Sequence, residues 1–284
     1  MPYRIGLDIG GTKISGVLFN SSMEPLETVI LPTMASSNAA STLTNVKAAV
    51  EKLSKGMRVS GVGISIAGRV DRNGRVTFNP NIKSLEGLNL RKRLGKLLKL
   101  PVKIENDGLC FAYGEYRLGA GRGCEDMVGI VVGTGIGGGL IISGRPYKGM
   151  GSAGEIGHMI IDPSGPRCGC GNNGDFESWC SGRNITRRYI EAGGKIPEPE
   201  PKKIFSSAEK IAREISRETI EKFGIGLANV QRAYDPEMIV MGGGLSNLHI
   251  YEHLEKEAEK HGTRIRIKKR KLEYPGESGA CLLP

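Results

Sequence analysis

Residues 3–19 read YRIGLDIGGTKISGVLF, and this stretch decides the fold. Apolar residues dominate segments 3–9 and 14–19, so we expect two buried strands joined by a tight glycine turn. The same plan recurs within 127–143, where two apolar segments flank the turn Gly133-Thr134-Gly135. Two lobes built on this plan would place the two turns on opposite sides of a cleft.

Strands and helices alternate through the rest of the chain. Strands are expected at 26–31, 59–66, 102–104, 127–132, 140–143, 238–241 and 264–268. Helical spacing of apolar residues predicts helices at 41–53, 88–98, 107–118, 176–192, 208–233 and 251–261. Such alternation is typical of the α/β class. Together with the repeated plan, it predicts one lobe over residues 1–107 and a second over residues 108–284.

The first turn has the composition of a phosphate-binding loop. Asp8 stands near the end of the strand, and Gly10, Gly11, Thr12 and Lys13 follow it. Glycine lets backbone N–H groups approach phosphate oxygens, the hydroxyl and ammonium groups add donors, and the carboxylate can hold Mg²⁺. The alternative interpretation is an ordinary Gly-Gly hairpin with a surface lysine.

Two more glycine turns follow apolar strands. Residues 133–139 read GTGIGGG and contain a formal G-x-G-x-x-G motif, with Glu155 near the distance of a ribose-binding acid. A nicotinamide oxidoreductase is therefore an alternative function, but its fold needs a helix directly after the glycines, and 140–143 is typical of a strand. In the third turn, residues 242–244, Gly243 could lie against a base or ribose, or simply belong to a loop.

Asp107 follows Glu105 and Asn106 between a predicted strand and a predicted helix. A carboxylate at this position could cap the helix by accepting a backbone N–H group. It is also well placed to act as a general base toward a hydroxyl nucleophile, a role that typically contributes ~10²–10⁴ in rate. The residues by themselves leave both roles open.

A Cys/His segment offers a second kind of chemistry. Cys168 and Cys170 are separated by one residue, His158 precedes them, and Asp175 follows. Two thiolates, an imidazole and a carboxylate are a plausible ligand set for a structural Zn²⁺. Reduced loop cysteines beside a histidine are the alternative, because Cys-x-Cys is less specific than paired Cys-x-x-Cys motifs.

Composition narrows the class of protein. The 284 residues include 42 glycines and 6 cysteines, and 40 Lys+Arg against 30 Asp+Glu give a formal charge of +10. The basic runs are short and aromatic residues are few, so we expect no nucleic-acid partner. The longest uncharged run, 127–144, is glycine-rich and does not predict a membrane helix. With no signal peptide and no disulfide framework, a cytoplasmic location is expected.

The motifs, taken in order, resemble the ROK (repressor, open reading frame, kinase) family of sugar kinases within the actin/hexokinase ATPase superfamily. The resemblance rests on Asp8-x-Gly-Gly-Thr-Lys13, Glu105-Asn-Asp107, Gly133-Thr-Gly-x-Gly137, Glu155-x-Gly-His158, Cys168-x-Cys-Gly171 and Gly242-Gly-Gly244. It implies two ribonuclease-H-like lobes that close over ATP·Mg²⁺ and a hexose, and a homodimer. The implied sugar is glucose or an N-acylhexosamine such as N-acetylmannosamine.

The resemblance also implies roles for single residues. Asp107 would be the base that takes the proton of the sugar 6-hydroxyl. The implied sugar-binding residues are Gly68, Asn81, Asn106, Asp107, Glu155, His158 and Glu177. The implied nucleotide-binding residues are Asp8, Gly10, Gly11, Thr12, Lys13, Gly133, Thr134, Gly135 and Gly243. A structural zinc would be held by His158, Cys168, Cys170 and Asp175.

The chain departs from the family pattern in three places. Asp175 stands where the family usually has a third cysteine, which makes the metal site harder in character. The sequence stops at Pro284, where relatives usually continue into a closing helix, and nothing ahead of Asp8 could form the winged helix of the repressor branch. A sugar sensor that binds without phosphorylating is the alternative function, although an intact Asp107 argues against it.

Overall fold

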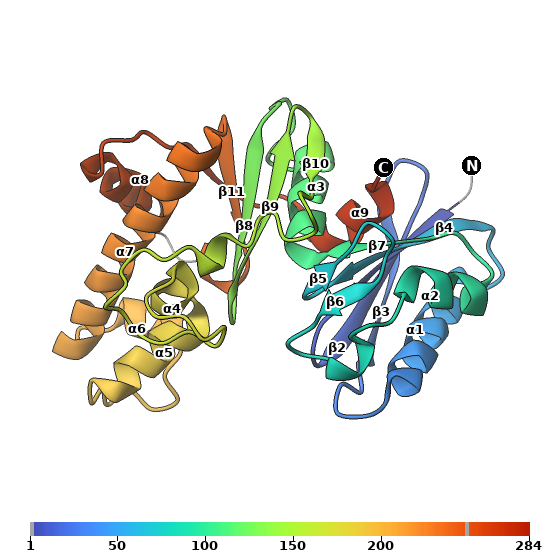
Figure 1. Ribbon diagram of the computed structural model, residues 1–284, viewed down its shortest axis with the longest axis horizontal. Coiled ribbons are helices and arrows are strands. Elements are labelled where there is room, and N and C mark those ends of the chain that lie inside the picture. Colours follow the sequence, from blue (N-terminus) through green and yellow to red (C-terminus); the bar gives the residue numbers. More distant parts are fainter. Residues whose placement is uncertain (1–2, 248–249) are drawn as a thin grey trace.

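The computed structural model describes residues 3–247 and 250–284 and contains two five-stranded sheets of the same topology (Figure 1). The first sheet has the order β3-β2-β1-β4-β7, formed by Pro25–Pro32, Lys13–Phe19, Tyr3–Ile9, Val59–Ile66 and Val102–Asn106. The second has the order β10-β9-β8-β11-β12, formed by Arg145–Tyr147, Ile136–Ile142, Met127–Val132, Met238–Gly242 and Ile267–Lys269. Each sheet joins three antiparallel strands to two parallel ones, so the predicted repeat is present.

Helices cover one face of the first sheet. α1 (Ala39–Ser54) begins at Asn38, whose side chain accepts the N–H of Ser41, and α2 (Leu90–Leu98) begins at Asn89 in the same way. Their apolar faces pack on the sheet and form the first core. A small hairpin of β5 (Arg69–Val70) and β6 (Val76–Phe78), followed by the short 3₁₀ helix η1 (Lys83–Leu85), extends from β4 toward the cleft.

Two helices fill the space between the sheets. α3 (Asp107–Leu118) packs on β8 and β9, and α9 (Pro275–Leu282) packs on β1, β4 and α3 (Figure 1). Glycines allow this approach, because a Cβ atom on Gly63 would fall closer than 3.0 Å to the backbone of Ala280. The sequence analysis expected no helix in this segment, whereas residues 275–282 form α9.

The other face of the second sheet carries α4 (Phe176–Cys180), α5 (Gly182–Glu191), α6 (Pro201–Ser206), α7 (Lys210–Tyr234) and α8 (Tyr251–Lys260). Two short 3₁₀ turns, η2 (Ile156–His158) and η3 (Gly244–Asn247), complete this lobe. The single helix predicted over 176–192 is interrupted at Ser181, which has an extended backbone and whose side chain caps α5 by accepting the N–H of Asn184. Serine favours such caps over helix interiors.

The predicted lobe boundary at residue 107 stays a prediction. Helix α3 begins at that residue and packs on the second sheet, whereas α9, which lies in the predicted second lobe, packs on strands of the first. In the described ranges, 3–247 and 250–284, no helix combines the length and the apolar character needed to cross a membrane.

Candidate active site

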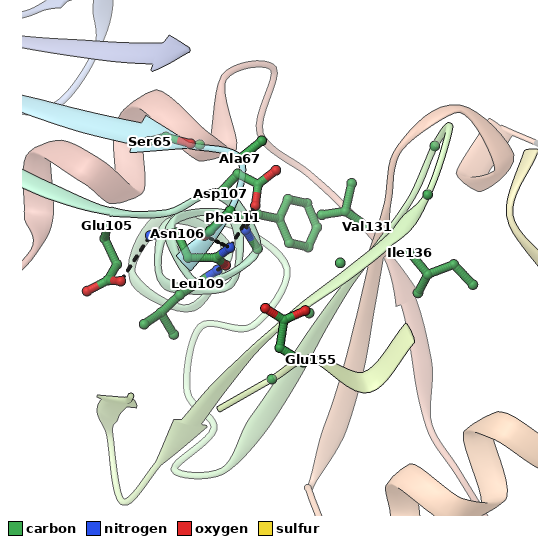
Figure 2. Close-up of a pocket in the computed structure, with 18 of the residues that line it drawn as sticks. Ser65, Ala67, Glu105, Asn106, Asp107, Leu109, Phe111, Val131, Ile136 and Glu155 are labelled. Carbon is green, nitrogen blue, oxygen red and sulfur yellow. Dashed lines mark hydrogen bonds between the residues drawn. The ribbon is translucent and has the colours of Figure 1, made fainter. Parts of the chain in front are cut away.

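A cleft of about 750 Å³ lies between the lobes and receives residues from both. This size suits a small-molecule site. Asp107, at the start of α3, and Glu155, just ahead of η2, both line it (Figure 2). All the residues that the resemblance assigns to sugar binding line the cleft. Among them, Gly68 also accepts a hydrogen bond at its carbonyl oxygen from the side-chain amide of Asn106.

Asp107 is held firmly at the start of α3. Its Oδ1 atom accepts the N–H of Gly108 at 2.9 Å and the side-chain amide of Asn106 at 3.0 Å. The N-cap of the helix is Asn106, whose Oδ1 accepts the N–H of Leu109 at 3.1 Å. The capping role considered for Asp107 thus belongs to its neighbour. These two hydrogen bonds of the Asp107 side chain end on Oδ1, so Oδ2 is the atom suited to accept a proton.

The surroundings of Asp107 tune it toward proton transfer at neutral pH. Burial, followed by the negative charges of Asp8 and Glu155, raises the pKa of Asp107 to about 7. A general base works best when its pKa lies near the working pH. A perturbed carboxyl group in a cleft is also a typical sign of a functional site.

Asp8 approaches the cleft from the first sheet. Its Oδ1 accepts the hydroxyl of Ser65 at 2.5 Å, and Ser65 is the residue paired with Asp8 in the parallel register of β1 and β4. Burial raises the pKa of Asp8, while the Ser65 hydrogen bond and the charge of Lys13 oppose that shift. Ser65 was missed in the sequence because only the strand pairing brings it to Asp8.

The residues predicted to bind sugar are held in place by contacts from both sides of the cleft. Arg69 on β5 donates from Nε to Glu155 Oε1 at 3.3 Å across the cleft, and Glu105 pairs with Lys148. Asn79 is fully buried, and its Oδ1 accepts the N–H groups of Asn81 and Ile82. Asn79 therefore sets the position of Asn81, although the sequence predicted a role for Asn81 alone.

The glycine turns meet the same cleft. Lys13, Gly133, Thr134, Gly135 and Gly243 line it, together with Asp8. Gly10, Gly11 and Thr12 are not among its lining residues; they form the turn that joins Asp8 to Lys13, closed by a hydrogen bond from Gly10 N to Lys13 O at 3.0 Å. A Cβ atom on Gly11 would stand 3.0 Å from Asn81, so this turn touches the loop that carries Asn81.

The oxidoreductase alternative is wrong on local structure. Residues 136–142 form strand β9, so the glycines at 133–138 lead into a strand and not into the helix that a dinucleotide fold requires. The strand also includes Gly137, Gly138 and Gly139, which were predicted as part of the turn. Gly138 and Gly139 pack against α3, where a Cβ atom on Gly139 would fall closer than 3.0 Å to Gly108 O.

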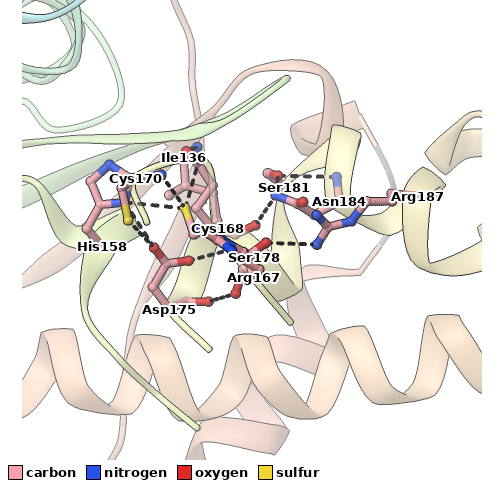
Figure 3. A network of polar contacts seen from close by, with 11 residues as sticks. Ile136, His158, Arg167, Cys168, Cys170, Asp175, Ser178, Ser181, Asn184 and Arg187 are labelled. Carbon is pink, nitrogen blue, oxygen red and sulfur yellow. Dashed lines mark hydrogen bonds and ion pairs between the residues drawn. The ribbon is translucent and has the colours of Figure 1, made fainter. Parts of the chain in front are cut away.

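His158, Cys168, Cys170 and Asp175 converge beside the cleft (Figure 3). Their four ligand atoms all lie within 4.8 Å of one another. Asp175 is fully buried: Oδ1 accepts the N–H of Ser178 at 2.7 Å and caps α4, while Oδ2 lies 3.1 Å from His158 Nδ1. Burial would raise the pKa of Asp175, but hydrogen bonds led by that from His158 lower it to about 2.

This cluster adjoins the predicted sugar-binding residues. His158 belongs to it and also lines the cleft. Glu177 follows Asp175 by two residues, and its Oε2 accepts the N–H of Ile136 at 2.7 Å. The cluster therefore lies where it can fix the positions of His158 and Glu177.

A set of cleft residues near the C-terminus was absent from the sequence prediction. Arg270, Glu273, Pro275, Gly276 and Glu277 line the cleft. A Cβ atom on Gly276 would lie 3.4 Å from Ser65 Oγ and 3.7 Å from Asp8 Oδ1. No motif in the sequence marks this segment, because its place depends on how α9 packs.

The raised pKa of Asp107 predicts the pH dependence of any reaction that uses it as a base. The required form is the ionised one, so a pKa raised from 3.8 to about 7 moves the acid limb of activity up to neutral pH. We expect kcat/KM to be lower at pH 6 than on the alkaline plateau by roughly tenfold. Initial rates between pH 5 and 9 at constant ionic strength measure this, and an acid limb near pH 4 would contradict it.

Comparison with known proteins decides the family. The model of the ROK family matches residues 4–270. This chain belongs to the ROK family. A glucokinase of Streptomyces coelicolor is 34% identical over 267 residues, which cover 87% of this chain and 83% of the relative. An N-acetyl-D-glucosamine kinase of Vibrio cholerae is 34% identical over 277 residues, covering 90% and 89%.

A solved ROK structure shares the fold. The ROK family glucokinase from Streptomyces griseus, in complex with glucose and AMPPNP, matches with a TM-score of 0.82 and 32% identity over 98% of both chains. These comparisons confirm the predicted ROK membership, the two-lobed actin-like α/β fold and the enzyme class, an ATP-dependent sugar kinase.

Proposed function

We propose that this ROK kinase transfers the γ-phosphoryl group of ATP to the 6-hydroxyl of a hexose, either glucose or an N-acylhexosamine. The observation that carries the proposal is Asp107, fixed at the start of α3 in the cleft wall with a pKa of about 7. Relatives named glucokinase and N-acetyl-D-glucosamine kinase support both sugar classes.

The predicted sugar-binding and nucleotide-binding residues would lie at two different ends of the cleft. Asn106, Asn81, Glu155, His158 and Glu177 would bind sugar hydroxyls, so that the 6-hydroxyl faces Asp107 Oδ2. Asp107 then takes the hydroxyl proton as the oxygen attacks the γ-phosphorus and the bond to the β-phosphate oxygen breaks. Positioning of the two substrates supplies much of the rate in such transfers.

The nucleotide end uses the glycine turns. Backbone N–H groups around Gly11 and Gly133, with Thr12, Thr134 and Lys13, would hold the phosphates, and Gly243 would lie near the adenosine. Asp8 is the carboxylate suited to hold Mg²⁺ directly or through water. The metal would neutralise charge on the phosphates. Closure of the lobes would exclude water, which otherwise competes with the sugar as nucleophile.

The test is ADP release with Mg·ATP over glucose, mannose, N-acetylglucosamine and N-acetylmannosamine. Sugar-dependent ADP release that the Asp107→Asn variant lacks would support the proposal and name the preferred sugar. Saturable sugar binding without ADP release from folded protein would instead support the sugar-sensor alternative. A product carrying phosphate at a position other than the 6-hydroxyl, found by NMR, would contradict the assigned acceptor.

We further propose that His158, Cys168, Cys170 and Asp175 hold a structural Zn²⁺. The donor set fits, since one nitrogen, two sulfurs and one oxygen can surround a tetrahedral ion. Asp175 fits in a particular way: with Oδ1 used to cap α4, Oδ2 faces His158 at 3.1 Å and Cys170 Sγ at 3.3 Å. The ion would fix the loop that carries His158 and adjoins Glu177.

Substitution of Asp175 separates its two roles. Asparagine keeps an oxygen that can cap α4 but supplies no anionic ligand, whereas cysteine supplies a softer thiolate. Because the four ligands form one site, we expect about one zinc ion per chain in protein purified without chelator. Asp175→Asn should lower the affinity for zinc at least ~10-fold, and Asp175→Cys should raise it. Metal analysis and competition with a zinc-binding dye measure this. Protein that contains only traces of zinc would contradict the site.

The homodimer and the cytoplasmic location stay predictions. Sedimentation equilibrium would decide the first, with twice the mass of 30.5 kDa as the expected result.

A further inference from the structure

Two segments of the described chain carry it from one sheet to the other. Helix α3 leads from β7 of the first sheet to β8 of the second, and residues 270–274 lead from β12 back to α9 on the first sheet (Figure 1). We call residues 270–274 the return segment. It differs from α3 in having no regular structure, so something outside it must fix its course.

A buried carboxylate on α3 holds the return segment. Glu115 is fully buried, and its Oε1 accepts the N–H of Leu272 at 2.8 Å. The N–H of Lys271 lies 3.1 Å from Oε1 and 3.0 Å from Oε2, and Oε2 also accepts the N–H of Ala120 at 2.8 Å. A buried carboxylate is costly unless it is hydrogen-bonded, and here backbone donors supply the bonds.

The neighbourhood is shaped around this carboxylate. A Cβ atom on Gly119 would fall closer than 3.0 Å to Glu115 Oε2, so glycine leaves the space that the side chain fills. Arg270 starts the return segment by donating its N–H to Met241 O at 2.9 Å, and its Nη1 atom donates to the carbonyls of Leu272 and Glu273. The segment thus has a fixed shape with its anchor on α3.

The return segment forms a wall of the cleft at the nucleotide end. Arg270 and Glu273 line the cleft together with Gly243, and a Cβ atom on Gly242 would lie 3.4 Å from Arg270 Cδ. The segment runs directly into the first turn of α9, where Gly276 adjoins Asp8 and Ser65. The path of the return segment therefore determines the position of two parts of the cleft wall, one beside Gly243 and one beside Asp8.

We propose that Glu115 is a positioning residue for nucleotide binding. By anchoring the return segment it holds the wall beside Gly243 and the first turn of α9 beside Asp8 in place before the nucleotide arrives. Helix α3 carries Asp107 at its start and Glu115 two turns later, so one rigid element places both the base and the nucleotide wall. The proposal rests on the proposed function, because it takes this end of the cleft to bind ATP.

The test compares Glu115→Gln with Glu237→Gln. Glutamine keeps one acceptor oxygen but turns an NH₂ group toward backbone donors. Glu237 is a matched control, since its Oε1 also accepts two backbone N–H groups, from Glu125 and Asp126, and it does not line the cleft. Calorimetric titration with Mg·AMPPNP, and separately with glucose and N-acetylglucosamine, gives the dissociation constants without requiring turnover.

We expect Glu115→Gln to raise the dissociation constant for Mg·AMPPNP at least ~10-fold, because the binding-competent arrangement becomes a minor population. Sugar affinity should stay within about twofold, and Glu237→Gln should change neither constant. Gly119→Ala, which keeps the carboxylate but displaces it, should repeat the nucleotide effect, and it decides the question if Glu115→Gln does not fold.

Unchanged nucleotide affinity in a folded Glu115 or Gly119 variant would overturn the proposal. Equal losses of sugar and nucleotide affinity would overturn it as well, because they would show general damage to the fold. The proposed function fails separately: wild-type protein that binds Mg·AMPPNP without phosphorylating any sugar contradicts the sugar-kinase proposal and leaves the role of Glu115 in nucleotide binding intact. Wild-type protein that does not bind Mg·AMPPNP contradicts both proposals.

Discussion

Replacement of Asp107 by asparagine is expected to lower kcat by at least ~10², and as much as ~10⁴, the range that a positioned general base contributes. Asparagine preserves the Oδ1 acceptor for Gly108 and Asn106 but cannot take a proton. Sugar affinity should therefore stay close to that of the wild type. Steady-state rates and calorimetric titration of the sugar on the same preparation measure the two quantities.

Asp71→Asn is a suitable control for this experiment. Asp71 Oδ1 accepts the N–H groups of Asn73 and Arg75 in the β5–β6 turn, a role that asparagine can also fill, and Asp71 does not line the cleft. Its kcat should match that of the wild type. A variant at 107 that loses sugar binding while turning over bound sugar normally would show that the base is another residue.

Gly279→Ala is expected to destabilise the fold more than any surface change, by about 3 kcal/mol or more. A Cβ atom at this position would fall closer than 3.0 Å to the carbonyl oxygen of Cys110 and to the N–H nitrogen of Gly114, so α3 and α9 would have to separate. Thermal unfolding followed by circular dichroism should show a midpoint lowered by roughly 5–10 °C.

Gly95→Ala is the matched control, with the opposite expected sign. Gly95 lies inside α2, and a Cβ atom there meets Leu100 O at an ordinary 3.7 Å. Alanine in a helix interior is favoured over glycine by roughly 0.5–1 kcal/mol, so this variant should be slightly more stable than the wild type. Equal midpoints for the two variants would contradict the close packing of α3 and α9.

The sequence predicted strands correctly where the pattern of apolar residues and the residues of the adjoining turn indicate the same structure. Residues 3–19 form β1 and β2 as expected, because an apolar run, two glycines and a second apolar run leave few alternatives. Helix α9 was not predictable, because the segment after Tyr274 is short, contains two glycines and has no amphipathic period. Its helical state depends on tertiary packing, which only the three-dimensional structure shows.

The residues of the candidate site also fall into those that the sequence predicted and those that only the structure shows. Asp8, Asp107 and Glu155 stand in motifs, and the structure brings all three to one cleft. Ser65 and Glu115 stand in no motif. Ser65 reaches Asp8 only through the register of two parallel strands, and Glu115 reaches Lys271 across 156 residues of chain. Roles that arise from such pairings cannot be read from spacing along the sequence.

The position of α9 has a consequence for how the protein is made. The first sheet is built from residues 3–106, yet the helix that covers its inner face is made of residues 275–282. While the ribosome is still synthesising the second lobe, the backbone at Gly6 and Gly63 lacks its covering helix. The N-terminal lobe therefore emerges first but is completed last, and in the nascent chain this uncovered face is open to aggregation or chaperone binding.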